Sequence, residues 1–157
     1  MLRSPAPGSV RIRASRHVAA DPSSTALLLA GPAALELWPG VRRVGAADGR
    51  VLVEAEIPAQ RRSTAATVLV TAPRRTPTSF VTRFEWAGPL LPRTQGELTL
   101  TYAAGTTTEG GPTTDVALVL DSDDLDDSAL TETALHGLAD AFLANLKELA
   151  EARSRAV

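Results

Sequence analysis

The spacing of hydrophobic residues predicts a strand at the start of the chain. Apolar Val10, Ile12 and Ala14 alternate with polar Arg11 and Arg13. In a strand, successive side chains point to opposite faces, so this pattern is typical of a strand with one buried face. We therefore expect a sheet with a polar side and a covered side.

Two short helices are predicted next. Asp21 can cap the first helix, and Pro22 fits its first position, where the missing N–H leaves no hydrogen bond unmade. Gly31 ends this helix, and a second spans residues 32–38 before a Pro-Gly pair stops it.

Six further strands follow, rich in Val, Thr, Leu and aromatic residues and separated by loops that contain Pro or Gly. We place them at residues 41–46, 50–57, 64–72, 78–87, 96–104 and 113–121. Between the first two, Gly49 can adopt the positive φ that a three-residue connection needs.

A long helix is predicted over residues 128–152. At 100° per residue its apolar side chains share one side: Leu135, Leu138, Ala139, Phe142, Leu146 and Leu149. His136, Asp140 and Lys147 fall on the opposite side, and Asn145 lies at the edge of the apolar stripe. The sheet is the apolar surface available to cover this stripe, so we expect the helix to pack on it.

This order of elements resembles the START-like, or SRPBCC, superfamily. The resemblance is carried by HVAADPSSTALLLAGPAALELWPGV near the start and ALHGLADAFLANLKELAEAR near the end. It implies an α+β helix-grip fold, in which a seven-stranded curved antiparallel sheet wraps around a long C-terminal helix, with two short helices between strands one and two. We expect residues 10–157 to form this domain and residues 1–9 to be a flexible tail.

The composition excludes several kinds of chemistry. The 157 residues include no cysteine and only two histidines, which removes disulfides, thiol nucleophiles and cysteine-ligated zinc. The formal net charge of -2 gives no reason to expect a nucleic-acid partner. We expect neither a metal nor a cofactor.

No segment predicts a membrane span. The apolar run ALLLAGPAAL is broken by Gly31 and Pro32 and is far shorter than the roughly 20 residues that cross a bilayer. The first ten residues lack the apolar core of a secretory signal. We therefore expect a cytoplasmic protein, either a monomer or a homodimer.

The covered face of the sheet is the predicted binding site. Its side chains are apolar or aromatic, with Thr82, Tyr102 and Asn145 as the polar groups within reach. Small-molecule sites have this character. The candidate ligand-binding residues are Trp38, Phe80, Thr82, Phe84, Trp86, Leu100, Tyr102, Leu138, Phe142 and Asn145. We expect no catalytic residue, because this face offers no carboxylate pair, histidine or lysine.

Other charged features fit surface roles better. The acidic run 121–127 departs from the calcium-loop template, which needs a glycine where Asp126 stands. Arg pairs at 42–43, 61–62 and 74–75 lack the aromatic partners of a nucleic-acid site, because the aromatic residues point inward. His136 and His17 are expected to face solvent.

Three functions stay open at this point. The first is a carrier or binder of a small hydrophobic molecule, such as a lipid, a polyketide or an isoprenoid-like compound. The second, implied by the resemblance alone, is a polyketide aromatase/cyclase or dehydratase-like enzyme in which Tyr102 or Asn145 polarises a carbonyl. The third is a protein-interaction module with a filled core.

Overall fold

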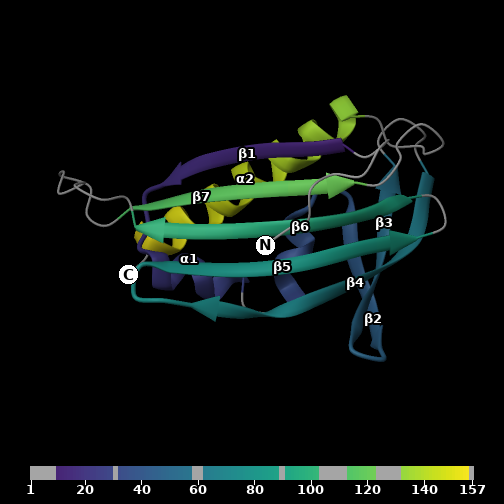
Figure 1. Cartoon of the computed structure of the whole chain (residues 1–157), viewed down its shortest axis with the longest axis horizontal. Helices are drawn as coiled ribbons and strands as arrows, with labels where there is room; N and C mark the ends of the chain where they lie inside the picture. The colour runs from purple at the N-terminus through teal and green to yellow at the C-terminus, as the bar shows by residue number, and fades with distance from the viewer. Residues whose placement is uncertain are drawn as a thin grey trace.

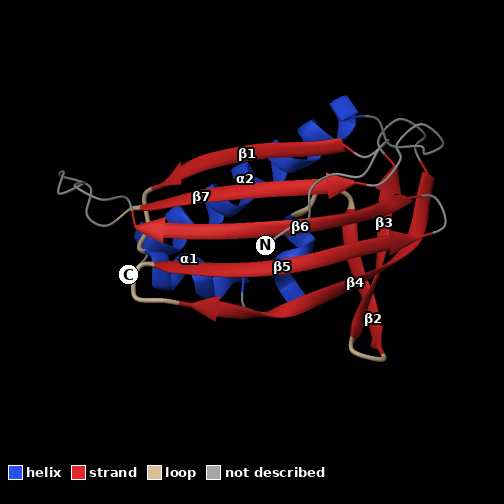
Figure 2. Ribbon diagram, viewed as in Figure 1, coloured by secondary structure: helices blue, strands red, loops and turns tan. Residues whose placement is uncertain are grey.

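The computed structural model describes residues 10–29, 32–57, 62–88, 91–102, 113–122 and 132–155. Within them, seven strands form one antiparallel sheet with the helices packed on one face (Figures 1 and 2). This confirms the predicted α+β helix-grip arrangement. The predicted tail at residues 1–9 lies outside the described residues.

After β1 at one edge, the chain crosses to β2 at the opposite edge and returns strand by strand to β7. The order of strands is β1-β7-β6-β5-β4-β3-β2, so the first and last strands pair with each other. In sequence order the elements are β1 Val10–Val18, α1 Pro22–Leu29, the 3-10 helix η1 Pro32–Leu37, β2 Val41–Ala47, β3 Arg50–Ile57, β4 Arg62–Arg75, β5 Ser79–Gly88, β6 Leu91–Tyr102, β7 Thr114–Ser122 and α2 Glu132–Arg155.

The cap of α1 forms as predicted. Asp21 Oδ1 accepts a hydrogen bond from the backbone N–H of Ser24 at 2.7 Å. This bond, which favours the charged carboxylate, lowers the pKa of Asp21. The second predicted helix is a 3-10 helix over Pro32–Leu37. The segment between Pro32 and the turn at Gly40 is short, and 3-10 helices are typical of short segments.

Two strands are longer than the sequence pattern predicted. β4 continues past Pro73 because the register shifts between Thr71 and Arg74, which leaves Pro73 outside the regular hydrogen-bond ladder. β6 begins at Leu91 rather than at Gly96. Gly96 lies inside this strand, opposite Phe84 of β5, whereas the sequence reading treated it as a strand boundary.

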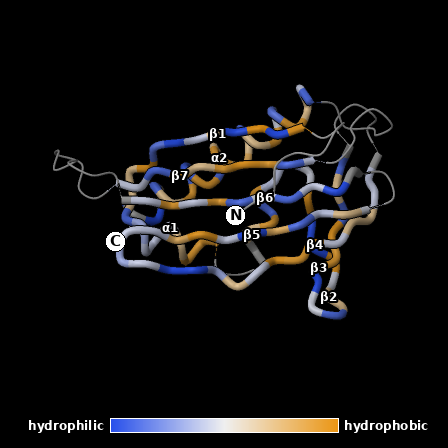
Figure 3. Tube along the Cα trace, viewed as in Figure 1, coloured by the Kyte–Doolittle hydropathy of each residue, from blue (hydrophilic) through white to orange (hydrophobic). Residues whose placement is uncertain are grey.

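Hydrophobic and hydrophilic positions alternate along the strands (Figure 3). The alternation separates an inner face, which the helices cover, from an outer face rich in ion pairs. On the outer face Arg83 Nε lies 2.8 Å from Glu97 Oε2, and Arg93 Nε lies 3.0 Å from Glu85 Oε1. The hydrogen bond from Arg93 lowers the pKa of Glu85.

The long helix α2 packs mainly against β1, near one edge of the sheet. Its buried side chains are Leu135, Ala139, Phe142, Leu143, Leu146 and Ala150. Leu138 and Leu149, which were predicted in the apolar stripe, are only half-buried, whereas Leu143 is fully buried. The buried stripe is therefore rotated from the predicted one, because the helix faces β1. α1 packs against β5 and β6, beside α2 and η1.

A charged cluster ties the last turns of α2 to the end of β1. Glu151 Oε2 accepts hydrogen bonds from Lys147 Nζ and, at 2.8 Å, from the backbone N–H of Ala19. Lys147 Nζ also donates to the carbonyl oxygen of His17 at 3.1 Å. The Lys147 bond, followed by the Ala19 bond, lowers the pKa of Glu151.

The contacts of Glu151 should make the free energy of unfolding depend on pH. Because the folded state holds the pKa of Glu151 below its ordinary value of 4.5, this stabilisation is present above pH 4.5 and is lost as pH falls through the folded pKa. Glu151→Gln should therefore lower the free energy of unfolding at pH 7 more than at pH 3. Urea denaturation at both pH values measures this. An equal loss at both would show that the charge of Glu151 contributes nothing.

Gly96 should be intolerant of a side chain. A Cβ added there would lie 2.1 Å from Cζ of Phe84, so Gly96→Ala must displace that ring and should destabilise the protein by about 1–3 kcal/mol. Gly137→Ala is the control, because nothing lies within 4 Å of its added Cβ on α2, and it should stabilise by about 0.5–1 kcal/mol. In urea denaturation, Gly96→Ala combined with Phe84→Leu should lose less than the sum of the two single changes. Additive losses would contradict the contact.

Candidate functional site

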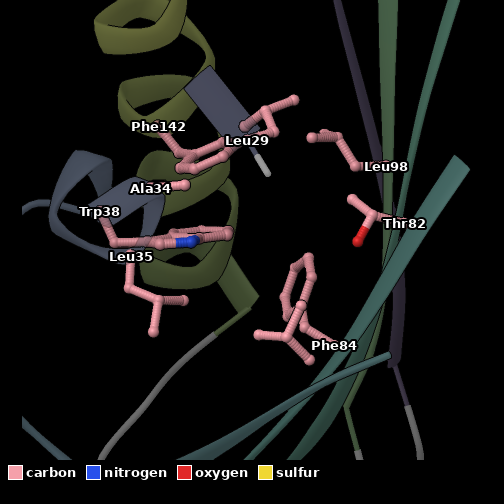
Figure 4. A pocket seen from close by; sticks show the side chains of 9 residues that line it. Leu29, Ala34, Leu35, Trp38, Thr82, Phe84, Leu98 and Phe142 are labelled. Atoms are coloured by element: carbon pink, nitrogen blue, oxygen red, sulfur yellow. The ribbon is translucent and has the colours of Figure 1, made fainter. Parts of the chain in front are cut away.

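A cavity of about 40 Å³ lies between the sheet and the helices (Figure 4). Its walls are almost wholly apolar. On the helical side the lining residues are Leu29 of α1, Ala34 and Leu35 of η1, Trp38 just after η1, and Phe142 of α2. On the sheet side they are Val70, Thr82, Phe84 and Leu98.

Trp38 is the centre of the aromatic side chains around this cavity. Its ring stacks on Phe142 of α2, with centroids 4.3 Å apart and an interplanar angle of 23°. It also meets Phe84 and Trp86 of β5 edge-on, at 5.9 and 6.0 Å. Such pairs contribute beyond the area they bury. Trp38 thus joins the helical layer to the sheet and closes one side of the cavity.

Thr82 supplies the polar group of the sheet wall. It is only 7% exposed, and its hydroxyl faces the space between the sheet and the helices (Figure 4). No described residue shares a hydrogen bond with this hydroxyl, and its oxygen is not among the fully enclosed polar atoms. The other buried hydroxyls do have partners within the chain; Thr94 bonds Ser122 at 2.9 Å, and Thr114 donates to the carbonyl oxygen of Ala20 at 2.7 Å. Thr82 can therefore bond a molecule in the cavity.

The cavity opens to solvent beside β4. Val70 lines the cavity opposite Phe84, yet 42% of its surface is exposed. The register shift of β4 begins one residue later, at Thr71. Bulges of this kind bend a strand away from its neighbour and are frequent next to binding sites. Val70 pairs with the buried Phe84 and so lies on the inner face, and its exposure marks the mouth.

The structure divides the ten predicted site residues into groups. Four line the cavity: Trp38, Thr82, Phe84 and Phe142. Phe80, Trp86 and Leu100 are buried in the surrounding core but do not line the cavity. The side chain of Tyr102 lies outside the described residues, although its backbone pairs with Thr114 at the end of β6.

Leu138 and Asn145 lie elsewhere. Leu138 lines a separate groove of about 370 Å³ with Pro39, Gly40, Glu56, Ala134 and Gly137. Asn145 is exposed, and its Nδ2 donates to the carbonyl oxygen of Leu37 at 2.7 Å. It fastens η1 to α2 and is not a cavity residue.

Sequence reasoning missed three lining residues of the first helices, namely Leu29, Ala34 and Leu35. It also left Val70 and Leu98 out of the site, although both lie in segments predicted to be strands of the sheet. The apolar run of α1 was the available signal. Period and composition alone do not show which part of a short, almost wholly apolar helix faces the sheet.

The chemistry available in the cavity is limited. No lining residue among those described carries a titratable group, and the described residues contain no group of His, Asp and Glu that could hold a metal. His17 Nδ1 lies 2.8 Å from Asp115 Oδ1, with both side chains more than half exposed on the outer face. His136 is exposed on α2. Most of the acidic run, residues 123–127, lies outside the described residues.

None of the described helices is long and apolar enough to cross a membrane.

Comparisons with known proteins identify the fold. No family model matches the chain, and no curated protein matches it in sequence. A START superfamily protein from Mycobacterium smegmatis superposes with a TM-score of 0.57 at 16% identity, covering 93% of this chain and 97% of its own. A conserved protein from Geobacillus kaustophilus gives 0.60 at 12%, covering 90% and 95%. Ara h 8.0201 gives 0.58 at 10%, covering 92% and 99%. The fold is therefore the START/Bet v 1-like helix-grip fold.

Thr82→Val tests whether the hydroxyl of Thr82 has a hydrogen-bond partner within the protein. Because the hydroxyl of this buried residue has no described partner, replacing it with a methyl group of similar size should raise the free energy of unfolding by up to about 1 kcal/mol. The measurement is urea denaturation, with Thr114→Val as the control, which should lose stability because it breaks a buried hydrogen bond. A comparable loss in Thr82→Val would mean that the hydroxyl already has a partner within the protein.

Proposed function

We propose that this protein binds and carries a small hydrophobic molecule between the sheet and its helices. The observation that carries the proposal is an apolar cavity whose sheet wall contains the hydroxyl of Thr82, which has no described partner. Apolar walls with a few placed polar groups are the usual composition of a small-molecule site. The helix-grip fold also supports a binding site here, since it places a long helix over one face of a sheet.

The volume of the cavity sets a condition on binding. At about 40 Å³ it has room for a water molecule or little more, whereas sites for drug-sized ligands measure about 300–1,000 Å³. A ligand must therefore move side chains as it enters. Trp38 and Phe142 are the ones we expect to move, because their stacked rings stand on the helical side and η1 is a short element.

The groove beside Leu138 continues this path. Pro39 and Leu138 line the groove, whereas the preceding Trp38 and, one turn along α2, Phe142 line the cavity. We therefore expect the stacked pair to separate the two spaces. Separation of these rings would join the cavity to a groove of about 370 Å³, which gives a site of ligand size.

The small cavity also favours a second candidate, a protein-interaction module with a filled core. No described lining residue can act as a general acid or base, so nothing specific favours the polyketide aromatase/cyclase or dehydratase alternative. Binding of an apolar probe distinguishes carrier from interaction module.

The test uses N-phenyl-1-naphthylamine, a neutral probe that fluoresces in apolar surroundings. Phe142→Leu removes the stacking partner of Trp38 and enlarges the cavity, so it should bind the probe about fivefold or more tightly than the unaltered chain. Phe80→Leu is the matched control, because Phe80 is equally buried but does not line the cavity. Fluorescence titration gives the affinities.

Native mass spectrometry of the protein purified without detergent complements the titration by revealing a bound molecule directly. The carrier proposal fails if no adduct is found and the probe binds Phe142→Leu no better than Phe80→Leu. That result would support the filled-core interaction module.

A further inference from the structure

Arg75 is a charged side chain on the inner face of the sheet. It pairs in register with Phe80 of β5, so both side chains point to the helical side. Its guanidinium carbon lies 5.2 Å from the centre of the Phe80 ring, a distance typical of a cation–π contact. Phe80 is buried, whereas Arg75 is exposed. A cation is therefore held over an aromatic ring at the rim of the inner face.

Arg75 has no acidic partner among the described residues, as is also true of Arg13, Arg16 and Arg74. Arg11, Arg42, Arg43, Arg83 and Arg93 each pair with a carboxylate. Among the described residues, none forms an ion pair with Arg75. The segment that packs against this part of the sheet, α1, reads PSSTALLL and carries no charge. The positive charge of Arg75 is left uncompensated on that side.

The position of Arg75 relates it to the cavity. Thr82 follows Phe80 by two residues on the same face of β5, or roughly 7 Å along the strand. Along β4, the register shift separates Arg75 from the exposed Val70 at the mouth. Arg75 therefore stands on the same strand as the mouth and on the same face as the unpartnered hydroxyl of Thr82.

We propose that the ligand is an anionic amphiphile, whose apolar body fills the cavity and whose acidic group, a carboxylate or a sulfonate-like anion, is held by Arg75 at the rim. This inference rests on the proposed carrier function. A planar guanidinium can donate two parallel hydrogen bonds to such a group, while its contact with Phe80 keeps it at the rim. The hydroxyl of Thr82 provides a further donor deeper in the site.

A pair of fluorescent probes that differ in one group tests the proposal. 1-Anilinonaphthalene-8-sulfonate is N-phenyl-1-naphthylamine with a sulfonate added, so the ratio of their affinities measures the contribution of the anion. The full chain should prefer the sulfonate by about 5- to 10-fold at low salt. Arg75→Gln should abolish this preference while leaving the affinity for the neutral probe within twofold.

Arg74→Gln is the matched control. Arg74 pairs with Val81, and its side chain therefore points to the outer face; its removal changes the net charge equally but should leave the preference intact. Equal losses in Arg74→Gln and Arg75→Gln would overturn the proposal, because they would reflect attraction to overall charge. Circular dichroism of each variant confirms that it is folded.

The same titrations distinguish the anion specificity of Arg75 from the carrier function. If both probes bind with equal affinity and Arg75→Gln changes neither, the anionic specificity is wrong and the carrier function stands. If neither probe binds the full chain or Phe142→Leu, the carrier function fails, and the inference about Arg75 fails with it.

Discussion

The contact between Trp38 and Phe142 governs the space between the two layers of this fold. Trp38 follows a short 3-10 helix, yet its ring reaches both the long helix and the aromatic row of β5. Asn145 adds a hydrogen bond that holds the end of η1 against α2. The helical layer over the inner strands therefore depends on a small segment, whereas α2 itself packs mainly on β1.

The sheet complements this arrangement through two irregularities. Gly96 leaves room for the ring of Phe84 to lie against β6, which keeps that ring from filling the cavity. The shifted register of β4 separates its last residues from the part that carries Val70, and so creates an opening at the side. An entirely regular sheet of large apolar residues would bring its side chains up against α1 and η1 and leave less space.

The sequence predicted the elements and the face they bury, because alternation in strands and 3.6-residue spacing in helices leave a direct record in the residue order. It was less informative about spatial contacts that join distant segments. Because α2 packs over β1, its buried side includes Leu143, which the predicted apolar stripe did not contain. Asn145 bonds the backbone of Leu37 and does not face the cavity. Gly96 and Pro73 suggested strand ends, although the first serves a close approach of Phe84 and the second lies in a bulge. These outcomes depend on tertiary neighbours that no local pattern encodes.

The small cavity follows from the energetics of a chain this size. Empty apolar space costs about 24 cal/mol per Å³, so a dry void of 300 Å³ would cost roughly 7 kcal/mol, a large part of the 5–15 kcal/mol that stabilises an ordinary domain. The observed 40 Å³ costs about 1 kcal/mol by the same rule. Under the proposed carrier function, the ligand-free chain of 157 residues gains stability by closing its apolar site with Trp38 and Phe142. The proposed ligand would then supply the free energy that reopens the site, which favours a molecule whose apolar body and charged group both find partners.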